Sequence, residues 1–280
     1  MKVLKIIFMI LLIILVADII YIMSGQRKET ILTDSVVLMK IEGVVFDSNE
    51  FIKTMDKYKD NHKVKAFIIQ INSPGGVIGP TQQIYRYIKD LKVPVYAAMD
   101  SVAASGGYYI AAACKKIYTL PGTLTGSIGV MLQLSNFKEL LDKVGINVVT
   151  VKSGRYKDIG SPYKEISEDE KMILQETIDD LYAQFINDIK DNRQIDNETI
   201  MQYADGRVFT GAKAIKLGFA DKVGTTEDAF NDLKKVLKDP NLKLYKHKEE
   251  KKFLEKLVSK LPFKVRSFLD NENFYYLYSL

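Results

Sequence analysis

Apolar and polar positions follow two different periods along this chain, and the switching between them predicts its elements. Residues 64–71 are almost continuously apolar, which predicts a largely buried strand. Shorter apolar runs at 36–41, 94–99 and 146–151 predict further strands. The segments between these strands, 49–59, 81–91 and 136–144, are predicted to be helices. Strands alternating with helices predict an α/β fold.

Four more helices are predicted in the second half of the chain. The motif Ser167-Glu-Asp-Glu170 is a capping box, and it opens a helix that reaches about Asn192. Residues 197–203, 211–217 and 226–237 also read as helices, and Gly218 ends the second of these. The apolar face of the long helix contains Ile173, Leu174, Ile178, Leu181, Tyr182, Phe185 and Ile189.

The N-terminal apolar stretch predicts a membrane anchor. Ile6–Val16 is unbroken apolar sequence, and Asp18 is the one charged residue between Ile6 and Met23. As a helix rising ~1.5 Å per residue, this stretch nearly matches a bilayer core of about 30 Å. The alternative is a cleaved signal peptide, but no small-x-small cleavage site precedes Asp18. We therefore favour an uncleaved signal anchor.

Composition and charge indicate how the chain is divided into segments and which partners it is not expected to bind. We expect an anchor over 1–25, a linker over 26–34, a globular domain over 35–239 and a lysine-rich, aromatic tail over 240–280. The net charge of +5 is spread along the chain, which argues against nucleic acid as a partner.

The few cysteines and histidines exclude several kinds of site. The single cysteine, Cys114, cannot form an internal disulfide, and its apolar surroundings predict a buried side chain. The two histidines, His62 and His247, have no partner at metal-ligand spacing. We therefore expect neither a metal, nor a cofactor, nor a histidine-based triad.

Two short motifs provide the parts of a nucleophilic site. Ser105 lies in a run of small residues, Ser101–Ala112, where the two following glycines allow a tight turn into a helix. A hydroxyl there meets free backbone N–H groups, which favour developing negative charge. About thirty residues upstream, Ser73-Pro-Gly-Gly76 presents backbone N–H groups without side-chain obstruction. The glycines could alternatively serve only the turn.

A serine nucleophile needs a base, and the absence of a suitable histidine leaves lysine. The segment 152–164 offers Lys152, Lys157 and Lys164. An ordinary lysine pKa is about 10.4, so a catalytic lysine needs burial that lowers the value by roughly three units, or about 4 kcal/mol. The residues alone do not choose among the three.

These motifs resemble the signal peptide peptidase A family in its short bacterial form. The serine, glycine and lysine segments occur in the family's order and are followed by Asp205–Gly211 and Leu217–Gly224. The resemblance covers about residues 35–238 and implies the Clp protease/crotonase fold of repeated strand–strand–helix units. It implies that Ser105 is the nucleophile, Lys157 the base, Gly75 or Gly76 with Gly106 the oxyanion hole, and Ser127 the residue that orients the lysine.

The resemblance also implies a function. It is that of a membrane-anchored serine endopeptidase of the cytoplasmic membrane, with its catalytic domain outside the cytoplasm. The expected substrates are apolar peptides, such as residual signal peptides and other membrane-derived or misfolded peptides. The expected partners are further copies of the chain in a ring and the lipid bilayer. The alternatives are a non-catalytic scaffold and a crotonase-type acyl-CoA enzyme on the same fold.

Two further hypotheses concern assembly and the tail. In tandem relatives the serine and lysine come from different repeats, so this single-repeat chain is expected to borrow one of them from a neighbouring copy. Phe274–Leu280 is apolar and aromatic, and we expect it to dock in or near the substrate groove, or on the membrane surface.

Overall fold

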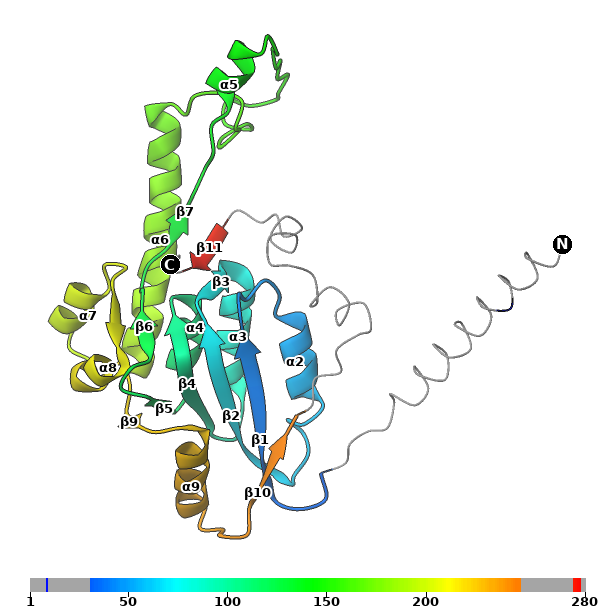
Figure 1. Cartoon of the computed structure of the whole chain (residues 1–280), viewed down its shortest axis with the longest axis vertical. Helices are drawn as coiled ribbons and strands as arrows, with labels where there is room; N and C mark the ends of the chain where they lie inside the picture. The colour runs from blue at the N-terminus through cyan, green and yellow to red at the C-terminus, as the bar shows by residue number, and fades with distance from the viewer. Residues whose placement is uncertain (1–8, 10–30, 248–273, 278–280) are drawn as a thin grey trace. The chain divides into compact units, whose positions relative to one another are not determined.

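The computed structural model describes residue 9, residues 31–247 and residues 274–277. The chain divides into two units, Met1–Leu32 and Thr33–Leu280, and the second contains every labelled strand and helix of Figure 1. Apart from Met9, the expected anchor over 1–25 lies outside the described residues, as do residues 26–30 and 248–273. Within the described ranges, no helix is both long and apolar enough to cross a membrane.

A mainly parallel sheet is the centre of the second unit. Its strand order is β10-β1-β2-β4-β5-β9, and every pair along this path is parallel. Beyond it, β6 pairs in parallel with β4, and β8 pairs antiparallel with β6. The strands are β1 (Ser35–Glu42), β2 (Val64–Ser73), β4 (Val95–Ala104), β5 (Lys116–Thr119), β6 (Leu124–Gly126), β8 (Val208–Thr210), β9 (Lys222–Val223) and β10 (Lys243–Lys246). The predicted α/β class is confirmed.

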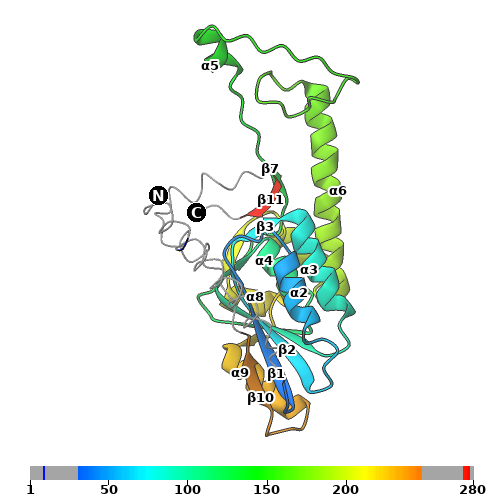
Figure 2. The same ribbon diagram turned by 90° about the vertical axis from the view of Figure 1, so that its right-hand side faces the viewer.

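Helices cover both faces of this sheet, which explains the continuous apolar run in β2. Ile68 packs with Phe230 and Leu233 of α9, while the alternate residues Phe67 and Ile69 are buried on the opposite face. Figure 2 shows α2, α3 and α4 on that opposite face. These helices are α2 (Asn49–Asp56), α3 (Ile78–Asp90), α4 (Gly106–Ala112) and α9 (Thr226–Val236), and α7 (Asn197–Tyr203) and α8 (Gly211–Leu217) lie near β8.

The sheet continues past residue 239, the expected end of the domain. β10 pairs in parallel with β1 from Ser35↔Lys243 to Leu38↔Lys246. Leu242 is buried in the same cluster as α9, and Leu244 packs against it. Residues 243–246 therefore belong to the sheet, although they lie beyond the expected boundary at residue 239. The sequence pattern did not predict this strand, because its lysines are typical of a solvated segment. An edge strand can carry such residues, since it has a neighbour on one side only.

The segment that follows β6, up to the first turns of the long helix Glu168–Asn192, forms an arm that extends from the sheet (Figures 1 and 2). It contains β7 (Met131–Leu132), α5 (Lys138–Lys143) and the first turns of α6 (Glu168–Asn192). The predicted capping box at the start of α6 is confirmed, with Ser167 and Glu170 bonding each other's backbone. Of the predicted apolar face of α6, only the C-terminal part around Phe185 and Ile189 is buried; the rest is half-exposed.

The predicted strand over 146–151 is wrong. These residues have no regular structure, and Val149 and Val151 are 78% and 94% exposed. A strand needs a neighbour to satisfy its backbone groups, and no described segment of the chain pairs with it. An apolar pattern typical of a core strand therefore lies on the surface of this chain.

Candidate active site

Ser105 lies at a sharp turn between β4 and α4. Its backbone has φ 51° and ψ −118°, and its amide donates to the Gly126 carbonyl at 2.8 Å. A positive φ in a residue other than glycine costs about 1–3 kcal/mol and persists only where the surroundings hold it. A strained strand-to-helix turn is also how hydrolases present a nucleophilic serine at the end of a sheet. The side chain is 2% exposed.

Packing accounts for the small residues around this turn. Ala103 and Ala104 are fully buried between strands and helices. A Cβ on Gly107 would lie 2.7 Å from the carbonyl oxygen of Ser73, which is closer than real side chains approach. The first turn of α4 therefore lies directly against the end of β2, as only glycine allows. Gly106 is the first residue of α4, where the amide has no acceptor within the helix.

The glycine motif forms a short strand, β3 (Gly75–Val77), beside this turn. One edge of β3 is bonded to Val45, whose amide donates to the Gly75 carbonyl and whose carbonyl accepts from the Val77 amide. A Cβ on Gly76 would lie 2.1 Å from the Val45 oxygen, so this position also requires glycine. Backbone groups of a strand alternate between its two edges, so the Gly76 amide faces the edge away from Val45.

That second edge of β3 holds a segment of the tail. β11 (Phe274–Leu277) pairs antiparallel with β3, with Tyr276 opposite Gly76, and antiparallel with β7 on its other side. Together they form a small sheet in the order β3-β11-β7. An extended chain therefore fits beside the glycine segment, and here it is supplied by the protein's own C-terminal residues.

Ser127 lies next to Ser105 in the sheet. The two serines follow the paired residues Ala104 of β4 and Gly126 of β6. Ser127 also has a positive φ, 49°, its amide donates to the Arg207 carbonyl at 2.8 Å, and its side chain is 8% exposed. Two neighbouring serines in strained conformations, both nearly buried, are brought together by strand register alone.

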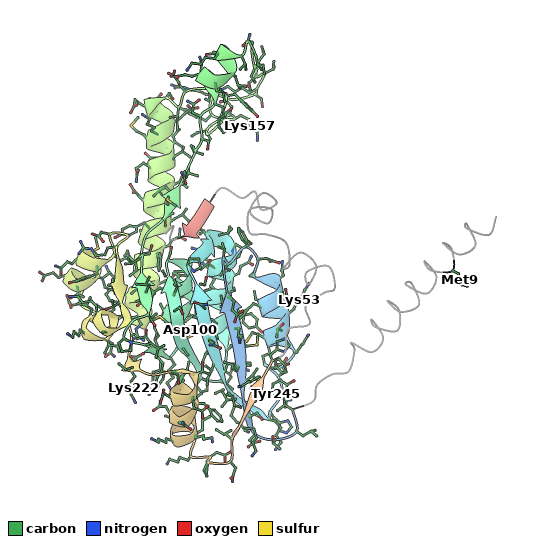
Figure 3. All side chains as sticks on the ribbon, viewed as in Figure 1. Met9, Lys53, Asp100, Lys157, Lys222 and Tyr245 are labelled. Atoms are coloured by element: carbon green, nitrogen blue, oxygen red, sulfur yellow. The ribbon has the colours of Figure 1, made fainter. Side chains whose placement is uncertain are left out.

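Lys157 is not brought to these serines within one chain. It is exposed in a turn of the arm, and Figure 3 places it there, whereas Asp100 of β4 lies in the sheet. Its side chain forms no ion pair with any residue that the structure describes. The serine and glycine segments thus lie together at the sheet, whereas the lysine segment lies in the arm.

The two competing lysines of the same segment are paired with acids. Lys152 and Lys164 both contact Asp158, the latter at 3.1 Å, and Lys164 also contacts the buried Glu170 at the start of α6. Hydrogen bonds from these lysines lower the pKa of Asp158, and the hydrogen bond to Glu170 raises the pKa of Lys164. Both lysines are therefore engaged by carboxylates.

Sequence reasoning missed the supporting role of two residues. Ser73 holds Gly75 through its hydroxyl, and Asp158 joins the lysines of the arm. A serine two residues before a glycine is a signal for a local side-chain-to-backbone turn, so Ser73 could have been found. The predicted burial of Cys114 is confirmed, and burial raises the pKa of its thiol to about 12.

Comparison with known proteins places the chain in a family. The model of peptidase family S49 matches residues 88–240, and the model of Clp protease matches residues 24–125. A protein of Enterococcus faecium provisionally named signal peptide peptidase SppA is 35% identical over 77% of this chain and 67% of its own length. Protease 4 of Salmonella typhi is 30% identical over 74% of this chain and 34% of its own length. The chain belongs to peptidase family S49, as the resemblance predicted, and its parallel-rich α/β sheet is consistent with the Clp protease fold.

The matches cover only part of several relatives. A protein of Synechocystis sp. provisionally named as a protease is 44% identical over 62% of this chain, and the match spans 63% of that relative.

Proposed function

We propose that this protein is a serine endopeptidase in which Ser105 attacks a peptide carbonyl and Lys157 accepts the proton of its hydroxyl. The observation that carries the proposal is the strained turn at Ser105 beside a glycine strand whose edge away from Val45 pairs with the extended segment β11. A serine hydrolase needs such a nucleophile, and a peptidase that binds its substrate by strand addition needs it in an extended form. Strand addition supplies that form through main-chain hydrogen bonds.

The proposed oxyanion hole consists of the amides of Gly76 and Gly106. The Gly75 amide, the other candidate, already donates to the Ser73 hydroxyl at 3.1 Å. The Gly76 amide faces the edge where β11 lies, and the Gly106 amide lies at the start of α4, where it has no acceptor within the helix. We assign Ser127 the role of orienting the lysine, since it lies beside Ser105.

The complete site is proposed to form between two copies of the chain, with Lys157 of one reaching Ser105 of another. Two observations support this. Lys157 lies in the arm, whereas Ser105 lies between β4 and α4 at the sheet. The arm also exposes many apolar side chains, which typically marks an interaction surface. Those exposed by more than a third include Met131, Leu134, Phe137, Leu140, Val144, Ile146, Val148, Val149 and Val151. Head-to-tail contacts of this kind close into a ring.

The proposed setting is the cytoplasmic membrane, with residues 1–25 as a single anchor and the peptidase domain on the outer side. The support is the apolar stretch Ile6–Val16 and the family's resemblance to signal peptide peptidases. Apolar signal peptide remnants are released in that membrane and are the proposed substrates, together with other membrane-derived or misfolded peptides. No cofactor is part of the proposal.

The proposal is tested by labelling the purified full chain with a serine-directed acylating probe and by assaying hydrolysis of a fluorogenic peptide. Ser105→Ala should abolish both signals, whereas Ser101→Ala, an exposed serine four residues earlier, should retain them. Lys157→Ala should lose hydrolysis, and Lys157→Arg should not restore it, because a guanidinium does not release its proton. Lys143→Ala on the same arm is the matched control.

Other outcomes would point to the alternatives. A folded wild-type chain that neither reacts with the probe nor cleaves peptides would favour a non-catalytic scaffold. Hydrolysis of acyl-CoA thioesters without reaction at Ser105 would favour a crotonase-type enzyme. Full activity in Lys157→Ala would overturn the assignment of the base.

A further inference from the structure

Ser73 occupies the junction between the glycine strand and the nucleophile helix. It is the last residue of β2 and is fully buried. Its hydroxyl accepts the Gly75 amide at 3.1 Å and lies 3.2 Å from the Gly75 carbonyl, to which it can donate. A single hydroxyl therefore engages both polar groups of Gly75. The backbone of Gly75 is held at φ 117°, a conformation that side chains rarely allow.

These bonds determine which amide reaches the substrate edge of β3. With the Gly75 amide used by Ser73 and its carbonyl also bonded to Val45 at 2.9 Å, the peptide group before Gly76 has little freedom to rotate. The Gly76 amide then faces the edge occupied by β11. Without the Ser73 hydroxyl, the buried Gly75 amide would lose its partner, and an unsatisfied buried donor favours rearrangement of the loop.

The backbone of Ser73 also determines the spacing between the two parts of the oxyanion hole. Its carbonyl oxygen lies 2.7 Å from the position that a Cβ on Gly107 would occupy, so Ser73 and the first turn of α4 are in direct contact. An oxyanion hole works only if both amides lie about 2.7–3.1 Å from the same oxygen. Ser73 contacts both segments that supply those amides.

We infer that Ser73 is a positioning residue that holds the Gly76 amide toward the oxyanion and in register with the Gly106 amide. It acts through Gly75 and does not itself touch the substrate. The inference rests on the proposed peptidase function and adds a residue that the mechanism proposed above does not use. Because the transition state carries the negative charge, loss of this positioning affects the chemical step and leaves binding of the extended peptide unchanged.

The test compares Ser73→Ala with Ser35→Ala in the full-length protein. Ser35 is a matched control, since it is also a buried serine whose hydroxyl bonds the backbone two residues away, but it lies at the start of β1. We expect Ser73→Ala to lower kcat roughly 10- to 100-fold with KM unchanged, somewhat less than deletion of an oxyanion donor. The affinity for a peptidyl boronic acid, which forms a tetrahedral adduct, should fall by the same factor, and the pH profile should keep its shape. Ser35→Ala should leave all three readouts unchanged.

A second variant separates positioning from packing. Ser73→Thr keeps the hydroxyl and should recover most of kcat, provided that its melting temperature shows a folded protein. Wild-type kcat in Ser73→Ala would overturn the inference. So would a loss of kcat accompanied by an equal loss of substrate binding, since that pattern indicates general disruption of the groove. If the wild-type chain neither cleaves peptides nor labels at Ser105, the proposed function fails and this inference fails with it.

Discussion

Ser105 and Lys157 belong to two regions of this chain that pack in opposite ways. Around Ser105, Ala103, Ala104 and Tyr108 have no exposed surface, whereas in the arm before Lys157, Val149 and Val151 are almost fully exposed. Both regions contain apolar runs in sequence. An apolar pattern in sequence therefore does not decide whether a segment is buried within its own chain.

The experiment with the largest expected change in activity asks whether Ser105 of one copy meets Lys157 of another. Ser105→Ala and Lys157→Ala proteins are each expected to be inactive. Assembled together at equal amounts, they should recover about a quarter of wild-type activity, because that share of head-to-tail contacts would join an intact serine to an intact lysine. Peptide hydrolysis by the mixture, measured against each variant alone, gives the answer.

The control for this experiment is a protein carrying both substitutions, mixed with wild type. This doubly substituted protein should create no active sites and should only dilute the wild-type ones. If mixed assemblies verified by mass remain inactive, the dyad forms within one chain, and the arm must then fold toward the sheet.

The next effect concerns the close packing of the sheet region. Gly107→Ala places a methyl group 2.7 Å from the Ser73 oxygen and should lower activity at least ~100-fold by displacing the first turn of α4. Gly79→Ala is the matched control, because open space surrounds that position at the start of α3. It should keep full activity and, as alanine favours helix, raise the melting temperature slightly. Equal activities of the two variants would contradict the packing argument.

A smaller effect concerns the tail segment β11, which pairs with β3. Truncation after Asp270 removes β11 and should raise the turnover of small peptides roughly 3- to 10-fold, since a tethered segment competes at a high effective concentration. A free peptide with the sequence Phe274–Leu280 should then restore the inhibition. Truncation after Asp239 is unsuitable, because it also removes β10 from the sheet. Unchanged turnover would leave β11 without a regulatory role.

The smallest expected changes, in stability, come from removing one ion pair in each of the two regions. Burial would raise the pKa of Asp232, but the Lys116 ammonium at 2.6 Å holds it at about 2. A carboxyl pKa that is depressed on folding stabilises the protein above the unfolded value of about 3.9, and this contribution is lost as the pH falls toward 2. Asp232→Asn should therefore lower the free energy of unfolding by about 1–2 kcal/mol at pH 7 and by less at pH 2.5.

The arm provides the contrast. Asp158 is also paired with lysines, but it lies outside the packed sheet. Asp158→Asn should leave the melting temperature nearly unchanged and lower kcat a few-fold, because the segment carrying Lys157 loses its attachment to Lys152 and Lys164. A drop in melting temperature equal to that of Asp232→Asn would show that the arm unfolds together with the sheet.

The sequence alone determined the α/β class, the positions of most strands and helices, and the capping box at Ser167, since these depend on local periodicity and local hydrogen bonds. It also determined the family, through the motifs around Ser105, Gly75 and Lys157. Only the tertiary structure showed that strand register brings Ser127 beside Ser105, that Ser73 holds the glycine strand, that 243–246 belongs to the sheet, and that 146–151 is not a strand. Each of these depends on which segments become neighbours, and hydrogen bonds between distant segments leave no periodic trace in the residues that form them.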